Sequence, residues 1–203
     1  MNLKTHILGP ALLALIALPG MGHAATLLSI DLSVQDEITI NAEPGLATVS
    51  ATGTDFTGFY LENFYSGPGI FPTATLVSGN LTTANQTSDN SPQLWRGGGT
   101  DLGLNIWSFA VGNTTSVTAG QQAFSGSATW SVSNAVYNDL LSGGGTFGNI
   151  YLNADTVDDI AGATLIGEFA ISPVPLPAPV LLLGTVLLAA GLYGRRRNSF
   201  AKA

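Results

Sequence analysis

The sequence contains no cysteine, and its central part, residues 25–172, contains neither histidine nor lysine. Both histidines, His6 and His23, lie near the start of the chain. Of the six basic residues, only Arg96 falls within the central part. Without disulfides this segment must be stable through packing alone, which its length permits for one domain.

These absences exclude most catalytic chemistry from residues 25–172. Nucleophiles activated by histidine, Schiff-base lysines, thiolate redox centres, and zinc or haem sites with histidine or cysteine ligands all lack a required side chain. Carboxylate chemistry remains, because glycoside hydrolysis needs only two suitably spaced acids. Glu62, Asp101 and Glu168 are candidates, although no motif pairs them. A carbohydrate-acting enzyme with a carboxylate pair is therefore the alternative hypothesis for the function.

Negative charge is concentrated in the central part. All thirteen acidic residues lie within 25–172, so with Arg96 this segment carries a net charge of −12, against −7 for the whole chain. Nucleic-acid binding demands a basic surface, and anionic lipid surfaces attract basic segments. Nucleic acid is therefore excluded as a partner of the central part.

The N-terminal residues follow the pattern of a secretory signal peptide. Lys4 precedes an apolar run at 7–18, Pro19-Gly20 ends that run, and small residues follow at Gly22 and Ala24. This order predicts a signal peptide over 1–24 that is cleaved between Ala24 and Ala25. The central part is then exported.

The C-terminal residues combine a proline-rich tag, an apolar run and a basic cluster. The run Val180–Tyr193 would span about 21 Å as a helix, short of a hydrocarbon core of about 30 Å. We expect a short transmembrane helix whose basic end stays in the cytoplasm. The tag consists of Val174, Pro175, Leu176, Pro177 and Ala178, and the basic cluster of Arg195, Arg196 and Arg197.

This order resembles the C-terminal signal of the PEP-CTERM class of exosortase substrates, in its VPLPA variant. The resemblance covers about the last thirty residues. It implies a Gram-negative bacterium, recognition by a membrane-embedded exosortase, and cleavage near the tag. It further implies transient residence in the inner membrane, followed by release to the outer surface or to an extracellular polysaccharide matrix such as that of a biofilm. The chain then divides into a signal peptide (1–24), an exported domain (25–172) and a sorting region (173–203).

The exported domain shows the composition of an all-β protein. Short alternating runs rich in β-branched and aromatic residues are separated by glycine-rich turns. This pattern predicts a single antiparallel β-sandwich or jelly roll. One helical turn is expected at Ser133–Leu141, with Ser133 or Asn134 as its cap and an apolar face of Tyr137, Leu140 and Leu141. The expected strands are Thr26–Leu32, Ile38–Asn41, Ala47–Ala51, Phe56–Asn63, Ala74–Val77, Leu104–Val111, Ala123–Val132, Phe147–Leu152 and Thr164–Ile171.

An acidic loop is a candidate metal site. Asn153, Asp155, Asp158 and Asp159 lie close together in the sequence, and clustered oxygen atoms are ligands of Ca²⁺. Their spacing does not match an EF-hand loop. The alternative is a solvated acidic turn that caps a helical turn. We expect no other cofactor.

Aromatic residues offer a candidate carbohydrate contact, because flat rings stack on the apolar faces of sugars. Trp107 and Trp130 lie in alternating apolar runs, where core packing explains them. Trp95 differs, since it lies beside Arg96 before three glycines. It is the candidate for contact with polysaccharide, the alternative being a loop residue folded back on the domain. Our main hypothesis is an exported structural or adhesive protein that is not an enzyme.

Overall fold

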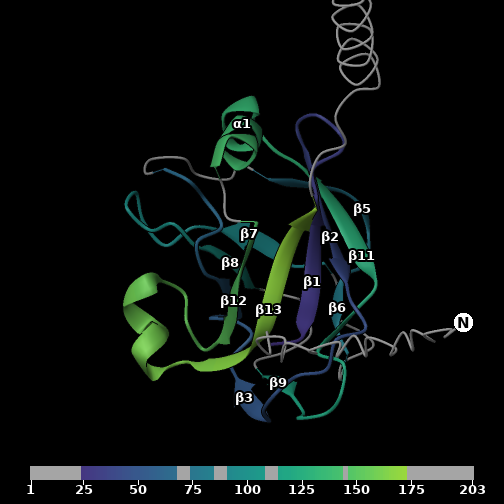
Figure 1. Ribbon diagram of the computed structural model, residues 1–203, viewed down its shortest axis with the longest axis vertical. Helices are drawn as coiled ribbons and strands as arrows, with labels where there is room; N and C mark the ends of the chain where they lie inside the picture. The colour runs from purple at the N-terminus through teal and green to yellow at the C-terminus, as the bar shows by residue number, and fades with distance from the viewer. Residues whose placement is uncertain (1–23, 68–73, 85–90, 108–113, 144–145, 173–203) are drawn as a thin grey trace, which may run out of the picture.

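The computed structural model describes residues 24–67, 74–84, 91–107, 114–143 and 146–172. The predicted signal peptide up to His23, the predicted tag at 174–178, the apolar run at 180–193 and the arginines at 195–197 lie outside this part. Within it the chain is mostly β-structure, with one α-helix and one 3-10 helix (Figure 1). No helix of the described part is long and apolar enough to cross a membrane.

The elements follow one another along the chain as β1 (Thr26–Asp31), β2 (Glu37–Ala42), β3 (Ala51–Gly53), β4 (Phe59–Leu61), β5 (Thr75–Gly79), β6 (Thr82–Thr83), β7 (Gln93–Trp95), β8 (Leu104–Trp107), β9 (Thr115–Val117), β10 (Phe124–Ser125), β11 (Ser127–Ser131), α1 (Asn134–Gly143), β12 (Phe147–Leu152), η1 (Val157–Gly162) and β13 (Thr164–Ser172).

Nine of these strands form one curled, mixed sheet in the order β5-β11-β2-β1-β13-β12-β4-β8-β7. Two small sheets, β10-β6 and β3-β9, complete the described β-structure. The all-β class is therefore confirmed. The expected arrangement is not observed, because most strands belong to a single half-barrel and because β1 and β13 run parallel.

The inner face of the curled sheet holds the core. Residues alternate in burial along the central strands, as expected where one face of a sheet is packed and the other is not. On β1 and β2, Ile30 lies opposite Ile40 and both are fully buried. From β4, Phe59 packs edge-to-face on Phe124 of a small sheet, with ring centroids 4.8 Å apart. The core thus joins the large sheet to the smaller ones.

The two ends of the domain meet in the middle of the sheet, where β1 lies beside β13 (Figure 1). Their pairing is parallel, with Thr26 opposite Glu168 and Asp31 opposite Ser172. The chain therefore enters at Ala24 at one end of the sheet and leaves after Ser172 at the other end.

Several expected strands agree with the structure in position. The predictions for β1, β2, β5, β12 and β13 are correct within about two residues at each end. The segment Ala123–Val132 is divided into β10 and β11 at Gly126, which has a positive φ of 78°. Only the first four residues of Leu104–Val111 are described as strand, since 108–113 lie outside the described part.

Two other strand predictions are largely wrong. Of Ala47–Ala51, only Ala51 belongs to a strand, β3. Of Phe56–Asn63, only the three central residues do, and Phe56 itself is 66 % exposed. The short strands β6, β7 and β9 were not predicted. Each has two or three residues, too few for an alternating pattern to be recognised.

The predicted helical turn is confirmed as α1. Ser133 is its N-cap, since its hydroxyl accepts a hydrogen bond from the Val136 backbone N–H at 3.4 Å. Tyr137 and Leu140 are buried as expected. Leu141 was wrongly assigned to the apolar face and is 45 % exposed, because Val136 completes the buried face one turn earlier.

Gly126 provides a test of the break between β10 and β11. A Cβ at this position would lie 2.1 Å from the carbonyl oxygen of Asn80, and its φ is unfavourable for any other residue. We expect Gly126→Ala to lower the free energy of unfolding by about 2 kcal/mol or more, measured by chemical denaturation. Gly162→Ala is the control, since an added Cβ there meets open space. Equal losses in the two variants would contradict the prediction.

Candidate functional site

A row of polar and aromatic side chains crosses four neighbouring strands. Trp95 of β7 pairs with Asn105 of β8, Asn105 pairs with Tyr60 of β4, and Tyr60 pairs with Tyr151 of β12. The residues that alternate with this row, such as Leu61, are buried in the core. The row therefore lies on the face turned away from the core.

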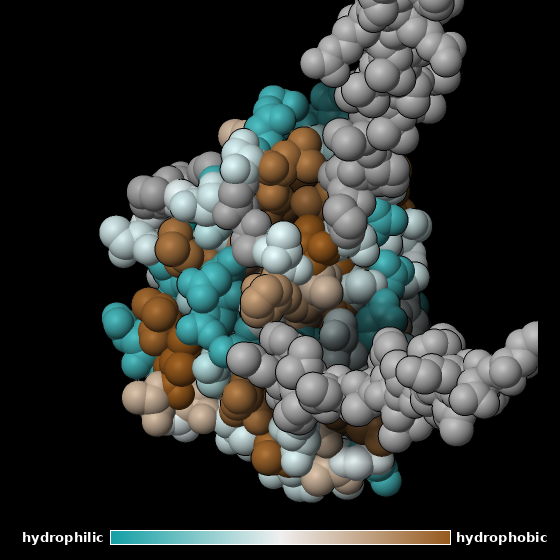
Figure 2. All heavy atoms as spheres, viewed as in Figure 1, coloured by the Kyte–Doolittle hydropathy of each residue, from teal (hydrophilic) through white to brown (hydrophobic). Residues whose placement is uncertain are grey.

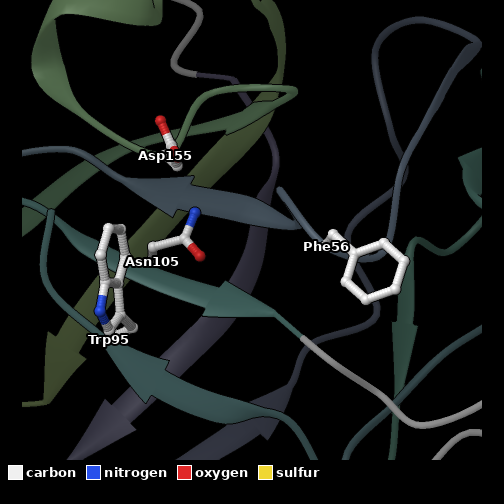
Figure 3. A pocket seen from close by; sticks show the side chains of 4 residues that line it. All are labelled: Phe56, Trp95, Asn105 and Asp155. Atoms are coloured by element: carbon white, nitrogen blue, oxygen red, sulfur yellow. The ribbon is translucent and has the colours of Figure 1, made fainter. Parts of the chain in front are cut away.

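Trp95 borders a hollow at the end of this row. The hollow measures about 110 Å³ and is lined by Phe56, Trp95, Asn105 and Asp155 (Figure 3). Trp95 is 39 % exposed, so its indole combines a fixed strand position with an accessible surface. In Figure 3 the indole lies beside the Asn105 amide, Asp155 lies above that amide in this view, and Phe56 lies apart on the right. Trp95 is thus the last residue of strand β7. Neither the polysaccharide contact nor the folded-back loop residue considered for Trp95 had placed it in a strand.

Asn105 holds together the segments around the hollow. Its side chain is 1 % exposed, and its amide nitrogen donates hydrogen bonds to the carbonyl oxygens of Thr57 at 2.7 Å and Ala154 at 3.0 Å. These two contacts fix the turn that carries Phe56 and the loop that carries Asp155. Asn105 was missed by the sequence analysis, because an asparagine within a strand has no recognisable signal.

Asp101 is buried beside Tyr60, the neighbour of Asn105 in the row. It is 5 % exposed, and its carboxylate accepts hydrogen bonds from the Tyr60 hydroxyl at 2.5 Å, the Gly103 backbone N–H at 2.7 Å and the Val157 backbone N–H at 2.9 Å. Three hydrogen bonds offset the cost of burying a carboxylate. Asp101 thereby connects β4, its own loop and η1, which indicates a structural role for this predicted catalytic candidate.

Arg96 is buried next to Trp95 in the sequence and fixes the loop that follows it. It is 2 % exposed, and its Nε donates to the Asp101 carbonyl oxygen. Its guanidinium donates to the Gly67 carbonyl oxygen at 2.9 Å and lies 4.4 Å from the centre of the Tyr65 ring. The one basic residue of 25–172 is therefore part of the interior and not of the surface.

Tyr60 and Tyr65 are both buried in this region, but they differ in whether their hydroxyl group has a hydrogen-bond partner. Burial raises the pKa of Tyr60, and the hydrogen bond to the Asp101 carboxylate raises it further. Burial also raises the pKa of Tyr65, with the Arg96 guanidinium opposing the change. Among the described residues, however, the Tyr65 hydroxyl has no hydrogen-bond partner. Both phenols therefore stay neutral in the folded protein well above their ordinary pKa of about 10.

The acidic loop is largely occupied by its own hydrogen bonds. The Asn153 amide donates to the Thr52 carbonyl oxygen at 3.2 Å. Asp159 accepts from the Thr156 backbone N–H at 3.2 Å and from its hydroxyl at 2.7 Å, which caps η1. Asp158 lies exposed on η1. The described residues contain no group of three or more acidic side chains arranged to hold a metal ion, and the Ca²⁺ hypothesis remains a prediction.

Asp155 and Asp159 form a carboxyl pair beside the hollow. The hydrogen bond that the Asp155 carboxyl donates to Asp159, with partial burial, raises the pKa of Asp155, and the same hydrogen bond lowers the pKa of Asp159. The two groups share a proton more readily than two isolated carboxylates would. This pairing of one predicted metal ligand with another was not anticipated.

The remaining carboxylate candidates lie on a second row of the same face. Glu62 accepts a hydrogen bond from the Asn149 amide at 2.8 Å, and Asn149 is the strand neighbour of Glu168. The Asn149 amide therefore lies between the two glutamates. Asn149 also donates a hydrogen bond to the Tyr151 hydroxyl at 3.3 Å. Burial raises the pKa of Tyr151, with a further contribution from the charge of Glu62.

The exposed apolar residues do not single out another site. Figure 2 shows them in several separate groups on the visible face of the domain. Trp130 is 2 % exposed and its indole N–H donates to the Pro92 carbonyl oxygen at 3.2 Å, which confirms the core interpretation. The side chain of Trp107 lies outside the described part. Trp95 is therefore the accessible tryptophan of the described residues.

Comparison of the chain with protein-family models, with curated proteins and with solved structures finds no match.

Tyr60 and Tyr65 form a matched pair for testing the hydrogen-bond network. We expect Tyr60→Phe to lower the free energy of unfolding by about 1.5–3 kcal/mol, because the buried Asp101 carboxylate loses a donor. We expect Tyr65→Phe to be neutral or stabilising, since it removes a buried hydroxyl that has no partner among the described residues and keeps the ring. Urea denaturation measures both values. A larger loss for Tyr65→Phe than for Tyr60→Phe would contradict the described network.

Proposed function

We propose that the chain is an exported precursor whose β-domain binds polysaccharide at the cell surface or in the extracellular matrix. The observation that carries this proposal is Trp95, a partly exposed indole held at the edge of a hollow beside Asn105 and Asp155. The role is structural or adhesive, because the site offers contact surface and hydrogen-bonding groups.

The chemistry of the hollow suits a sugar ring. An indole stacks on the apolar C–H face of a pyranose, while the neighbouring Asp155 carboxyl group binds hydroxyls at the ring edge. Strand pairing with β8 fixes the backbone of Trp95, and the contacts of Asn105 fix the two flanking segments. Little ordering is then needed when a ligand binds, which favours affinity.

The charge of the domain narrows the choice of polysaccharide. Residues 25–172 carry a net charge of −12, and Asp155 lies at the hollow. A polymer of uronic acids would be repelled at low ionic strength, whereas a neutral or amine-bearing polymer would not. We therefore propose a neutral or amine-bearing polysaccharide as the ligand.

The proposal of sorting rests on the sequence of the tag and its flanking segments. The parallel pairing of β1 and β13 supports it indirectly, since Ser172 and Ala24 lie at opposite ends of the sheet. A membrane segment attached after Ser172 would therefore hold the domain at the end of the sheet opposite to the entry of β1. The proposed partners are an exosortase-like enzyme, the inner membrane before processing, and the polysaccharide.

A carbohydrate-acting enzyme is the second candidate. The observation in its favour is the raised pKa of Asp155 beside an exposed tryptophan, which is the property of a general acid. Its pairing argues against glycoside hydrolysis, since Asp155 and Asp159 are directly hydrogen-bonded whereas the two carboxyls of such enzymes lie about 5 Å or more apart. Binding without turnover is therefore favoured.

Trp95→Ala tests the binding proposal. We expect it to weaken retention of the protein on an insoluble neutral polysaccharide, such as cellulose or chitin, by about fivefold or more, since loss of one stacked aromatic removes roughly 1–3 kcal/mol. Trp95→Phe should retain part of the binding. Affinity is measured by depletion from solution at increasing amounts of polymer, with alginate beads as the acidic comparison.

Phe147→Ala is the matched control, because Phe147 is 58 % exposed but does not line the hollow. Equal binding by wild type and Trp95→Ala would contradict the proposed site. Release of reducing sugar during the same incubation, abolished by Asp155→Asn, would favour the enzyme.

The sorting proposal predicts the mass of the exported product. When the full chain is produced with an exosortase, the protein recovered from the medium should begin at Ala25 and end near Pro177. Replacing both Pro175 and Pro177 with alanine should leave the apolar run attached and the protein in the membrane fraction. Intact mass spectrometry measures both outcomes, and a secreted product that retains residues 180–203 would contradict sorting.

A further inference from the structure

A carboxylate holds the first residues of the exported domain. The backbone N–H of Ala24 donates a hydrogen bond to the Glu168 side chain at 3.1 Å. The backbone N–H of Glu168 donates to the Ala25 carbonyl oxygen at 3.0 Å, and Thr26 follows as the strand neighbour of Glu168. Glu168 therefore contacts the chain on both sides of the bond between Ala24 and Ala25.

Two glycines pack closely against the same segment. A Cβ on Gly45 would lie 2.0 Å from the Thr26 carbonyl oxygen and 3.3 Å from the Ala25 Cβ. A Cβ on Gly167 would lie 2.9 Å from the Ala25 carbonyl oxygen. The segment is thus held in place once the domain has folded. A protease that needs an extended chain on both sides of the bond must act before β1 docks.

We propose that cleavage after Ala24 creates an α-ammonium group on Ala25 that forms an ion pair with the Glu168 carboxylate. This inference rests on the export proposed above. Hydrolysis adds one water to the peptide bond, so that Ala24 leaves with a carboxylate and Ala25 keeps its nitrogen, which takes up a proton. The ion pair then replaces the hydrogen bond that the Ala24 amide makes. In the processed protein it holds the first residue of the chain against β13.

The charge of the exported domain strengthens this pair. Apart from the buried Arg96, the new ammonium is the one cation within residues 25–172. Besides Glu168 on β13, Glu43 lies beside β1: its backbone N–H donates to the Leu27 carbonyl oxygen at 2.9 Å, and its side chain accepts a hydrogen bond from Ser29 at 2.5 Å. Such surroundings raise the pKa of an amine, because they favour its charged form.

The experiment compares exported wild type with Glu168→Gln and with Glu43→Gln as the control. Each full chain is produced with its signal peptide, and the N-terminus of the exported form is identified by mass spectrometry. The pKa of the Ala25 amine is obtained from its rate of modification by an amine-reactive reagent between about pH 6 and about pH 10, with the N-terminal peptide quantified.

We expect the wild-type amine to titrate about half a unit to one unit above the ordinary α-amino range of roughly 7.7–8.0, so that it reacts about three- to tenfold more slowly at neutral pH. Glu168→Gln should return the pKa to the ordinary range, and Glu43→Gln should have the smaller effect. A raised pKa stabilises the fold below the ordinary value, and this contribution is lost as the pH rises through the raised value. The melting temperature of wild type should therefore fall more than that of Glu168→Gln above about pH 8.

A wild-type amine that titrates in the ordinary range would overturn the ion pair, and this measurement stands even if Glu168→Gln does not fold. An unchanged pKa in Glu168→Gln would overturn it as well. These results leave export intact, whereas recovery of a chain that still begins at Met1 would overturn export itself. Neither result bears on polysaccharide binding, which Trp95→Ala tests separately.

Discussion

The burial of Arg96 and Asp101 within one short loop is the constraint on which the site depends. Burying a charge is costly unless hydrogen bonds compensate for it. Asp101 meets this condition through Tyr60, Gly103 and Val157, and Arg96 through backbone carbonyl oxygens and the Tyr65 ring. These contacts join three segments that are far apart in the sequence. They give the neighbouring strand β7 a fixed support, and with it Trp95.

The parallel pair β1–β13 provides the second organising feature. It makes the first and last strands of the β-domain neighbours in the sheet, while the chain enters β1 and leaves β13 at opposite ends of these strands. The proposed signal peptide and the proposed sorting region are therefore attached at opposite ends of this strand pair. The same pairing brings Glu168 to the entry of β1, so that a residue near the end of the domain determines the environment of its beginning.

The agreement between prediction and structure depended on the length of each element. Strands such as β2, with six residues in an alternating pattern, were predicted from local periodicity. The three residues of β7 were not, because their strand state comes from pairing with β8. Gly126 shows the opposite case, where a single glycine ended a run that otherwise has the composition of one strand. Of the residues that line the hollow, the sequence had indicated only two as candidates. Trp95 was a candidate for carbohydrate contact and Asp155 for a Ca²⁺ site.

The sequence by itself determined which side-chain chemistries residues 25–172 lack, since this segment contains no histidine, lysine or cysteine. It also determined the β-class, because alternation and turn residues are local properties. Only the tertiary structure decided that Trp95 and Asp155 face one hollow, and that Tyr60 binds a carboxylate 41 residues away. Periodicity specifies which side of a strand is buried, but the partner of each strand depends on how the whole chain packs, and that information is distributed over all of its residues.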